Sequence, residues 1–311
     1  MPAPERPPPA AAELRPPPAA GVIHDIGYRH HDGPRFGRWY VVRSLAVHSL
    51  RGAYGLGRPV RSKVMPALLL AAITFPALIM VVVTVITEAD KLPLDYVDYI
   101  PVTFYLIAIF LAAQAPQLVS HDLRFRQIPL YFSRPLTYAD YVLAKYAAMV
   151  AALLVLMCTP LTVLYAGALL AELPFWAQTR GVLQGLAGAL LFAVVLGGIG
   201  LAIASATPRR GFGVAAIITV ILISYTVVSS VEGIALEEDH PEVAMYAELF
   251  TPFNLVNSLQ LWLFDREENA LFATLPTPDG WQGVIFAAVA LGLVAASAGF
   301  LLLRYRRASA S

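Results

Sequence analysis

Residues 181–205 read GVLQGLAGALLFAVVLGGIGLAIAS, an uninterrupted apolar run with no charged side chain. An α-helix rises about 1.5 Å per residue, so about 20 such residues cross the roughly 30 Å hydrocarbon core of a bilayer. Five further ranges have the same character: 64–86, 97–119, 142–169, 211–231 and 281–303. The sequence therefore predicts an all-α membrane protein with six transmembrane helices.

The charged residues between these six ranges are sorted onto two sides. The segments before the first range, after the second, after the fourth and after the sixth hold 19 of the 22 Lys and Arg residues, counting Lys145 with the second of them. The same segments hold only 6 of the 21 Asp and Glu residues. Because basic residues stay in the cytoplasm when spans insert, we expect both termini to be cytoplasmic.

Composition agrees with a membrane protein and limits its chemistry. The chain is 58% hydrophobic and 14% charged, whereas soluble domains are about 25% charged. Within the six ranges the only Asp, Glu, Lys, Arg or His residues are Asp98, at the edge of the second, and Lys145, which can snorkel from the third. Ion-coupled carriers usually need ionisable groups at depth, so we expect the energy source to lie in another protein. The single Cys158 excludes an intrachain disulfide.

The chain before the first span divides into two parts. Residues 1–35 are rich in Pro and Ala and predict a disordered cytoplasmic tail with no signal peptide. Residues 36–63 predict an amphipathic helix in the cytoplasmic interface, with a short helix packed on the protein itself as the alternative. The apolar face of this helix consists of Trp39, Val42, Ala46, Leu50, Ala53 and Tyr54. A short cytoplasmic tail is expected over 306–311, after a transmembrane domain over 64–305.

The loop 120–141, SHDLRFRQIPLYFSRPLTYADY, ends in a helix-start signal. Thr137 is placed as the N-cap and Asp140 three residues later, and Leu136 and Tyr141 are placed as a hydrophobic staple. A short, partly apolar helix joined stiffly to two spans can transmit force from a soluble partner. The alternative is an amphipathic loop resting on lipid headgroups.

Two sets of residues inside the spans are candidates for packing and for a substrate path. A stripe of small residues in the fourth span permits close helix approach and comprises Gly181, Gly185, Ala189, Ala193 and Gly197. The candidate path-lining residues are polar, and interhelical hydrogen bonding is the alternative role for each. They are Gln114, Gln117, Thr159, Thr162, Ser224, Tyr225, Thr226 and Ser229.

The segment 243–264 is apolar enough to suggest a seventh span. It contains Glu248, Pro252 and three amide side chains, and a seventh crossing would place the basic C-terminal residues outside. We therefore expect two short helices, broken near Pro252, that dip into the outer leaflet.

The order of these elements resembles the permease subunits of type-2 ATP-binding-cassette exporters. The local matches are FSRPLTYADYVLAK (132–145) and Thr251-Pro252-Phe253, within a resemblance that covers roughly 36–305. His121-Asp122-Leu123-Arg124 stands where many family members carry a Glu-rich helix, so the contact residues depart from the family pattern.

The resemblance implies that residues 36–57 form a gate helix and that residues 120–131 form a coupling helix on an ATPase subunit. The coupling residues would be His121, Asp122, Leu123, Arg124, Phe125, Arg126 and Ile128. The family assembles from two ATPases and two permeases, identical or paralogous. The chain has no G-x-x-x-x-G-K-[ST] motif, so ATP and Mg would bind to the partner, and no catalytic residue, metal or cofactor is expected here.

The absence of charge in the spans favours an amphiphilic substrate such as a lipid, drug or peptide. The high Ala, Pro and Arg content is typical of a GC-rich bacterial genome, so we expect a bacterial cell-membrane location. The rival hypotheses are a non-catalytic membrane anchor of another complex and an intramembrane enzyme, which would need a buried His that the spans lack. Nucleic-acid binding has no support, because the basic residues lie at membrane edges.

Overall fold

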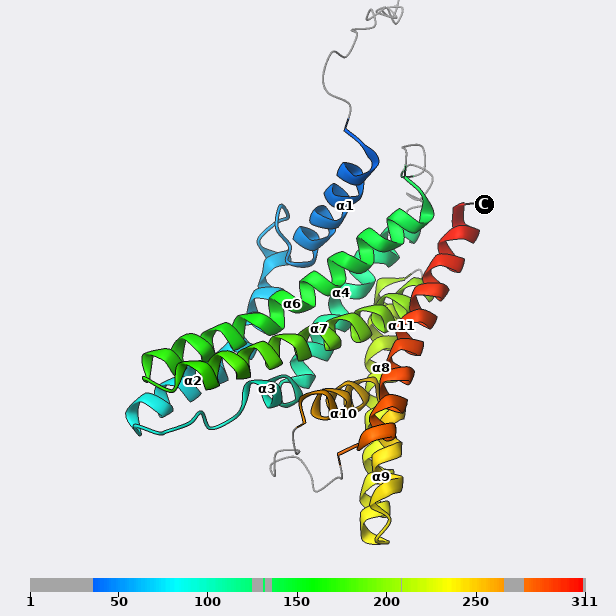
Figure 1. Cartoon of the computed structure of the whole chain (residues 1–311). Helices are drawn as coiled ribbons and strands as arrows, with labels where there is room; N and C mark the ends of the chain where they lie inside the picture. Colours follow the sequence, from blue (N-terminus) through cyan, green and yellow to red (C-terminus); the bar gives the residue numbers. More distant parts are fainter. Residues whose placement is uncertain (1–35, 125–130, 132–135, 208, 266–276, 310–311) are drawn as a thin grey trace, which may run out of the picture. The chain divides into compact units, whose positions relative to one another are not determined.

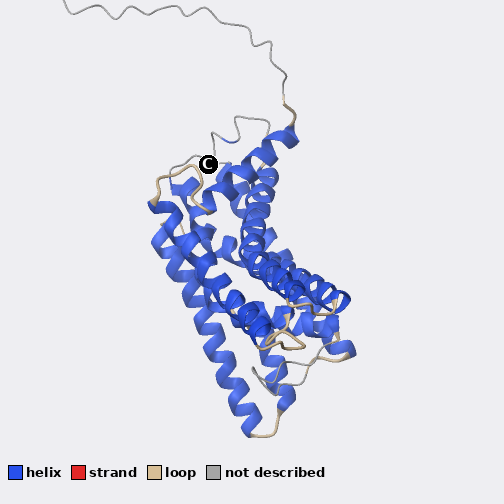
Figure 2. Cartoon of the chain, turned by 90° about the vertical axis from the view of Figure 1, so that its left-hand side faces the viewer, coloured by secondary structure: helices blue, strands red, loops and turns tan. Residues whose placement is uncertain are grey.

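We analysed a computed structural model of the chain, which describes residues 36–124, 131, 136–207, 209–265 and 277–309. Met1–Phe36 and Gly37–Ser311 form two separate units, and every described helix lies in the second. All regular secondary structure in the described residues is helical (Figure 2). The prediction of an all-α protein is confirmed for this part of the chain.

Five of the described helices are long and apolar enough to cross a membrane. They match five of the predicted spans and are α2 (Arg61–Ile86), α6 (Tyr138–Leu170), α7 (Phe175–Ala206), α8 (Arg210–Glu237) and α11 (Gly280–Ser309). A sixth span exists if α3 (Tyr96–Val102) and α4 (Phe104–Arg124) count as one element. The chain is a multi-pass membrane protein.

The second predicted span is two helices rather than one. α3 and α4 meet at Thr103 with a bend of 61°. Pro101 explains the break, because proline has no N–H to donate to the carbonyl four residues earlier and its ring crowds that turn. The acceptor left open is the Val97 carbonyl, which instead receives a hydrogen bond from Gln260 Nε2 at 3.4 Å.

α6 and α7 form the centre of the helical unit and lie side by side (Figure 1). About half of the apolar window of each is buried, whereas α2, α8 and α11 expose most of theirs. Apolar side chains exposed along a spanning helix are stable in lipid, where burial between helices brings no hydrophobic gain. The three outer helices therefore present a lipid-compatible surface.

The small-residue stripe of α7 lies against two neighbours. A methyl group placed on Gly181 or Gly185 would lie 2.8 or 3.0 Å from Tyr96 of α3, closer than carbon atoms normally approach. Ala189 and Ala193 are fully buried, and Gly197 faces Met149, Val150 and Leu153 of α6. The stripe thus lies where α3 and α6 approach α7.

The segment before α11 contains the predicted pair of short helices. α9 (Pro241–Ala247) is followed by a single turn, η1 (Glu248–Phe250), and by α10 (Pro252–Phe264), so the break near Pro252 is confirmed. α10 packs on α7 and α11. Gly283 of α11 allows this contact, because a methyl group there would lie 2.1 Å from the Trp262 ring.

The N-terminal helix α1 (Arg38–Ala53) packs on α6 and α4. It ends in a Schellman turn, in which the Leu56 N–H bonds the Arg51 carbonyl at 2.8 Å and Gly55 has a φ of +67°. A Cβ on Gly55 would lie 2.5 Å from the Ser62 carbonyl oxygen of α2. Glycine at this position therefore fixes the tight junction between α1 and α2.

Candidate functional site

The start of α6 carries the capping box predicted from the sequence. Thr137 Oγ1 accepts a hydrogen bond from the Asp140 N–H at 3.3 Å, and Asp140 Oδ2 accepts one from the Thr137 N–H at 2.9 Å. Leu136 and Tyr141, the predicted staple residues, are both buried. The capping box is confirmed, and it gives this helix a rigid first turn.

The same carboxylate holds the N-terminal helix. Arg38 of α1 donates from Nε and Nη2 to the two oxygens of Asp140, each at 2.8 Å. This two-pronged geometry is the strong form of an arginine–carboxylate pair. The hydrogen bond to Asp140 also raises the pKa of the Arg38 guanidinium, so the pair stays charged. The beginning of α1 is therefore tied to the beginning of α6.

A second, buried cluster ties the end of α4 to α6. Asp122 Oδ2 lies 2.8 Å from Lys145 Nζ and accepts a hydrogen bond from the Tyr141 hydroxyl at 2.6 Å. The Asp122 and Lys145 side chains are only 8% and 9% exposed. The sequence prediction that Lys145 snorkels is wrong, because its ammonium group is buried in this ion pair.

The cluster extends to the last helix. The Tyr141 ring lies 4.8 Å from the ring of Tyr305 near the end of α11, centroid to centroid. Both rings are almost completely buried. The ends of α4 and α11 and the start of α6 therefore meet in one packed cluster, at the end of the helical unit where α1 also lies (Figure 1).

These contacts bracket the loop predicted to act as a coupling helix. The first of its residues, His121 to Arg124, continue α4 as its last turn, with Asp122 turned into the protein. Phe125, Arg126 and Ile128 lie outside the described residues. Both ends of the loop are thus anchored, one through Asp122 and the other through the capping box.

The predicted face of the N-terminal helix is only partly covered. Val42 is buried, and the Tyr54 hydroxyl donates to the Ala152 carbonyl of α6 at 2.7 Å. Ala46 and Leu50 are partly buried, whereas Trp39 is 73% exposed. α1 thus packs on the protein, as the alternative hypothesis had it, and still presents an aromatic side chain outward.

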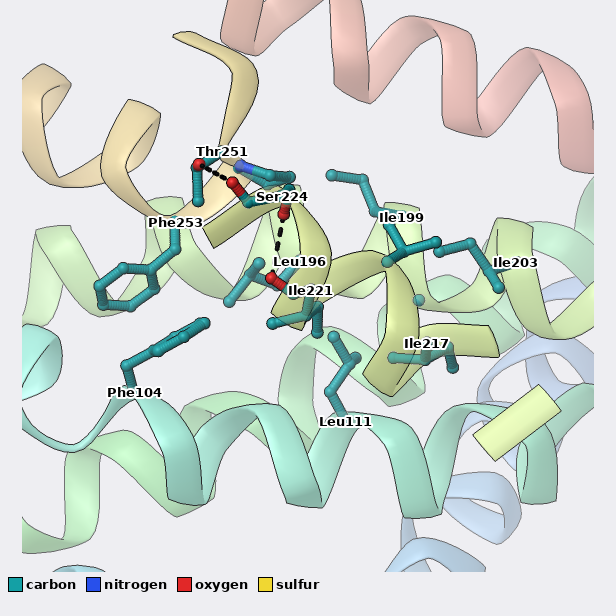
Figure 3. Close-up of a pocket in the computed structure, with 13 residues that line it drawn as sticks. Phe104, Leu111, Leu196, Ile199, Ile203, Ile217, Ile221, Ser224, Thr251 and Phe253 are labelled. Carbon is teal, nitrogen blue, oxygen red and sulfur yellow. Dashed lines mark hydrogen bonds between the residues drawn. The ribbon is translucent and has the colours of Figure 1, made fainter. Parts of the chain in front are cut away.

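A small apolar cavity lies where α4, α7, α8 and α10 meet (Figure 3). The Phe104 and Phe253 rings, 4.0 Å apart between centroids, close one end, and branched aliphatic side chains form most of the remaining wall. The volume is about 20 Å³, room for about one water molecule. The hydroxyls at its edge are already used, since Ser224 donates to the Ile221 carbonyl and Thr251 to the Ser224 carbonyl. The cavity is therefore too small for an amphiphile.

The eight candidate path-lining residues are not brought together. Ser224 lies on the apolar cavity, and Tyr225 packs near Phe104 at 5.9 Å between ring centroids. Thr159 and Thr162 bond carbonyls of their own helix. The other four are Gln114, buried beside Met65; Gln117, bonded to the Gly52 carbonyl; Thr226, exposed; and Ser229, partly buried.

Sequence reasoning missed Arg38 and Tyr305 as members of the anchored end. Arg38 lies about one hundred positions from its partner, so no local pattern links them. Lys145 did carry a signal, because a buried ammonium group in an apolar run needs a carboxylate partner. No group of three or more His, Cys, Asp or Glu residues in the described part of the chain could hold a metal ion.

No protein-family model matches the chain, and no curated protein matches it either. The anchored loop, the helix α1 and the distribution of charge are therefore the basis on which a function can be proposed.

Proposed function

We propose that this chain is the transmembrane permease subunit of an ATP-driven exporter in a bacterial cell membrane. A separate cytoplasmic ATPase, present in two copies, binds ATP and Mg and docks on the loop between α4 and α6. A second permease, identical or paralogous, completes the assembly. The substrate is amphiphilic: a lipid, a drug or a peptide.

The observation that carries this proposal is the anchoring of the loop at both ends. At the end of α4, Asp122 is held by Lys145 and Tyr141. At the far end of the loop, Thr137 and Asp140 are held by the capping box and by Arg38. Each anchor includes a charge-assisted hydrogen bond, and such bonds are roughly twice as strong as neutral ones. A displacement of the loop is therefore passed to α1, α4 and α6 together rather than lost in a flexible hinge.

The distribution of charge supports an external energy source. The ion pair between Asp122 and Lys145 lies at the anchored end of the helices, where α4 ends and α6 begins. A proton or ion relay would instead need ionisable groups spaced across the spans. In this proposal the ATPase binds two states of the loop with different affinity. That difference in binding free energy, and not an ion gradient, drives the switch between the states.

The test is co-purification of the ATPase with loop variants. We expect the double variant Phe125→Asp, Ile128→Asp to insert in the membrane normally and to lose its bound ATPase, because two carboxylates would be buried at the docking surface. The matched control is Val60→Asp, which adds a carboxylate at a 74% exposed position before α2. Undiminished recovery of the ATPase with the double variant would refute docking at this loop.

A further inference from the structure

A polar cavity lies between α1, α4 and α6, beside the contacts that join them. Its volume is about 130 Å³, enough for a compact polar group. Two of its wall residues, Asp122 and Lys145, belong to the anchored end already described, and the others are Tyr131 and residues from α1, from the turn after it and from α4. The lining consists of His48, Ser49, Gly52, Arg58, Gln117, Leu118, Asp122, Tyr131 and Lys145.

Ser49 gives this cavity an unused hydrogen-bonding group. The residue is only 6% exposed, and its Oγ has no hydrogen-bond partner among the described residues. The neighbouring Gln117 amide is occupied, since its Nε2 donates to the Gly52 carbonyl at 2.9 Å. A buried hydroxyl without a hydrogen-bond partner is unfavourable. A bound group that accepts a hydrogen bond from Ser49 is therefore favoured in the cavity.

The charge around the cavity is positive. Residues 36–63 contain six Lys or Arg residues and no Asp or Glu. Arg58 forms part of the wall, and one of its terminal nitrogens lies 3.7 Å from where a Cβ on Gly52 would stand. The Lys145 charge is balanced by Asp122, which leaves Arg58 as the net charge of the lining. The cavity therefore suits an anion.

A wider cavity adjoins the first and shares His48, Gly52 and Arg58 with it. Its volume is about 520 Å³. Its wall adds a second guanidinium, that of Arg51, and two apolar side chains, Val47 and Leu56. Val47 and Leu56 are about half exposed. A mouth that combines cationic and exposed apolar side chains is suited to an amphiphile rather than to a small soluble anion.

We propose that these two cavities bind the phosphate-bearing headgroup of an anionic phospholipid. The Arg58 guanidinium and the Ser49 hydroxyl donate hydrogen bonds to the phosphate oxygens, a geometry for which arginine is well suited. Arg51 lies at the mouth, and Val47 and Leu56 contact the glycerol and the first acyl carbons. Free phosphate could make the same hydrogen bonds, but it has no apolar part that could contact the side chains at the mouth.

Arg58 also has a structural role that does not depend on a ligand. A cation near the last carbonyls of α1 stabilises that helix through its dipole. Loss of Arg58 alone would therefore not separate ligand binding from helix stability. Ser49 separates them, because its hydroxyl makes no hydrogen bond to any of the described residues that a substitution would remove.

The experiment measures lipid binding by purified full-length protein in maltoside micelles, with native mass spectrometry to count bound lipid. The probes are dioleoylphosphatidylglycerol, dioleoylphosphatidylcholine and inorganic phosphate. We expect the wild type to retain phosphatidylglycerol in preference to phosphatidylcholine. We expect Arg58→Gln to lower that affinity about tenfold and Ser49→Ala about fivefold, with the melting temperature of lipid-free Ser49→Ala no lower than that of the wild type. The matched control, Arg61→Gln, removes an exposed charge outside both cavities and should leave the affinity unchanged.

Three results would overturn the proposal. The first is equal retention of the two lipids, and the second is an equal effect of Arg58→Gln and Arg61→Gln. The third is displacement of phosphatidylglycerol by millimolar inorganic phosphate, which would make the natural ligand a soluble phosphate rather than a lipid. A loss of affinity in Ser49→Ala without a fall in its melting temperature would support the headgroup site directly.

Discussion

Replacing Lys145 with Met tests whether the buried ion pair anchors the end of α4. The substitution keeps an unbranched side chain of similar length and removes only the ammonium group. Asp122 would then keep the Tyr141 hydroxyl at 2.6 Å as a donor but lose the cation at 2.8 Å. The remaining carboxylate, whose side chain is 8% exposed, would be buried and would have lost its ammonium partner.

The expected cost follows from that burial. Removing one partner of a buried pair typically destabilises a protein by about 3–5 kcal/mol, because the other charge is left uncompensated. Removing both charges, with Asp122→Asn and Lys145→Met together, should cost much less, since the Asn oxygen can still accept from Tyr141. The two single substitutions should therefore be strongly non-additive, with a coupling free energy of about 3 kcal/mol.

The assay is reversible unfolding in mixed micelles with increasing SDS, followed by far-ultraviolet circular dichroism, for the two single variants and the double variant. Lys63→Met is the matched control, because Lys63 is exposed and belongs to no ion pair in the described residues. The reasoning is refuted if Lys145→Met costs less than about 1 kcal/mol, the value of a solvent-exposed pair. It is equally refuted if the double variant loses as much unfolding free energy as the two single variants lose together.

Three further substitutions test other parts of the account, each by the same unfolding measurement. Thr137→Ala removes the N-cap of α6 and should cost about 1 kcal/mol, whereas Thr137→Ser should restore most of it. Gly283→Leu should cost about 1–3 kcal/mol because the new side chain meets the Trp262 ring, and an unchanged stability would mean that α10 and α11 are not in contact as described. Gln260→Leu should cost about 1–3 kcal/mol because it leaves the Val97 carbonyl buried without a donor, while Gln260→Glu at a pH that protonates the carboxyl should cost less.

Local patterns in the sequence were sufficient to predict much of the fold. Five spans can be predicted from the length of their apolar runs alone, because a helix of about 20 apolar residues matches the hydrocarbon core of a bilayer. The capping box at Thr137 and Asp140 and the break before Pro252 also follow from short-range rules, because every atom involved lies within a few residues. Such features need no knowledge of which helices are neighbours.

The features that sequence reasoning missed depend on neighbours. The bend at Thr103 had a local signal in Pro101, but prolines also occur inside continuous helices, and α2 contains two. Arg38 and Asp140 meet only because α1 folds back along α6. The polar residues given as candidates for a path lie on several helices and are not gathered in one place, and a polar side chain in a span can bond its own helix as readily as a ligand.

The proposal that this chain works with a soluble ATPase is tested most directly by purifying the tagged protein from its native membrane in mild detergent. Mass spectrometry then identifies the proteins that accompany it. We predict a soluble protein with a phosphate-loop motif, recovered in a one-to-one ratio with permease chains, and either this chain alone or a paralogue as the second permease. Recovery of the chain alone, or only with membrane subunits that lack such a motif, would contradict the proposal and would favour a membrane-anchor role.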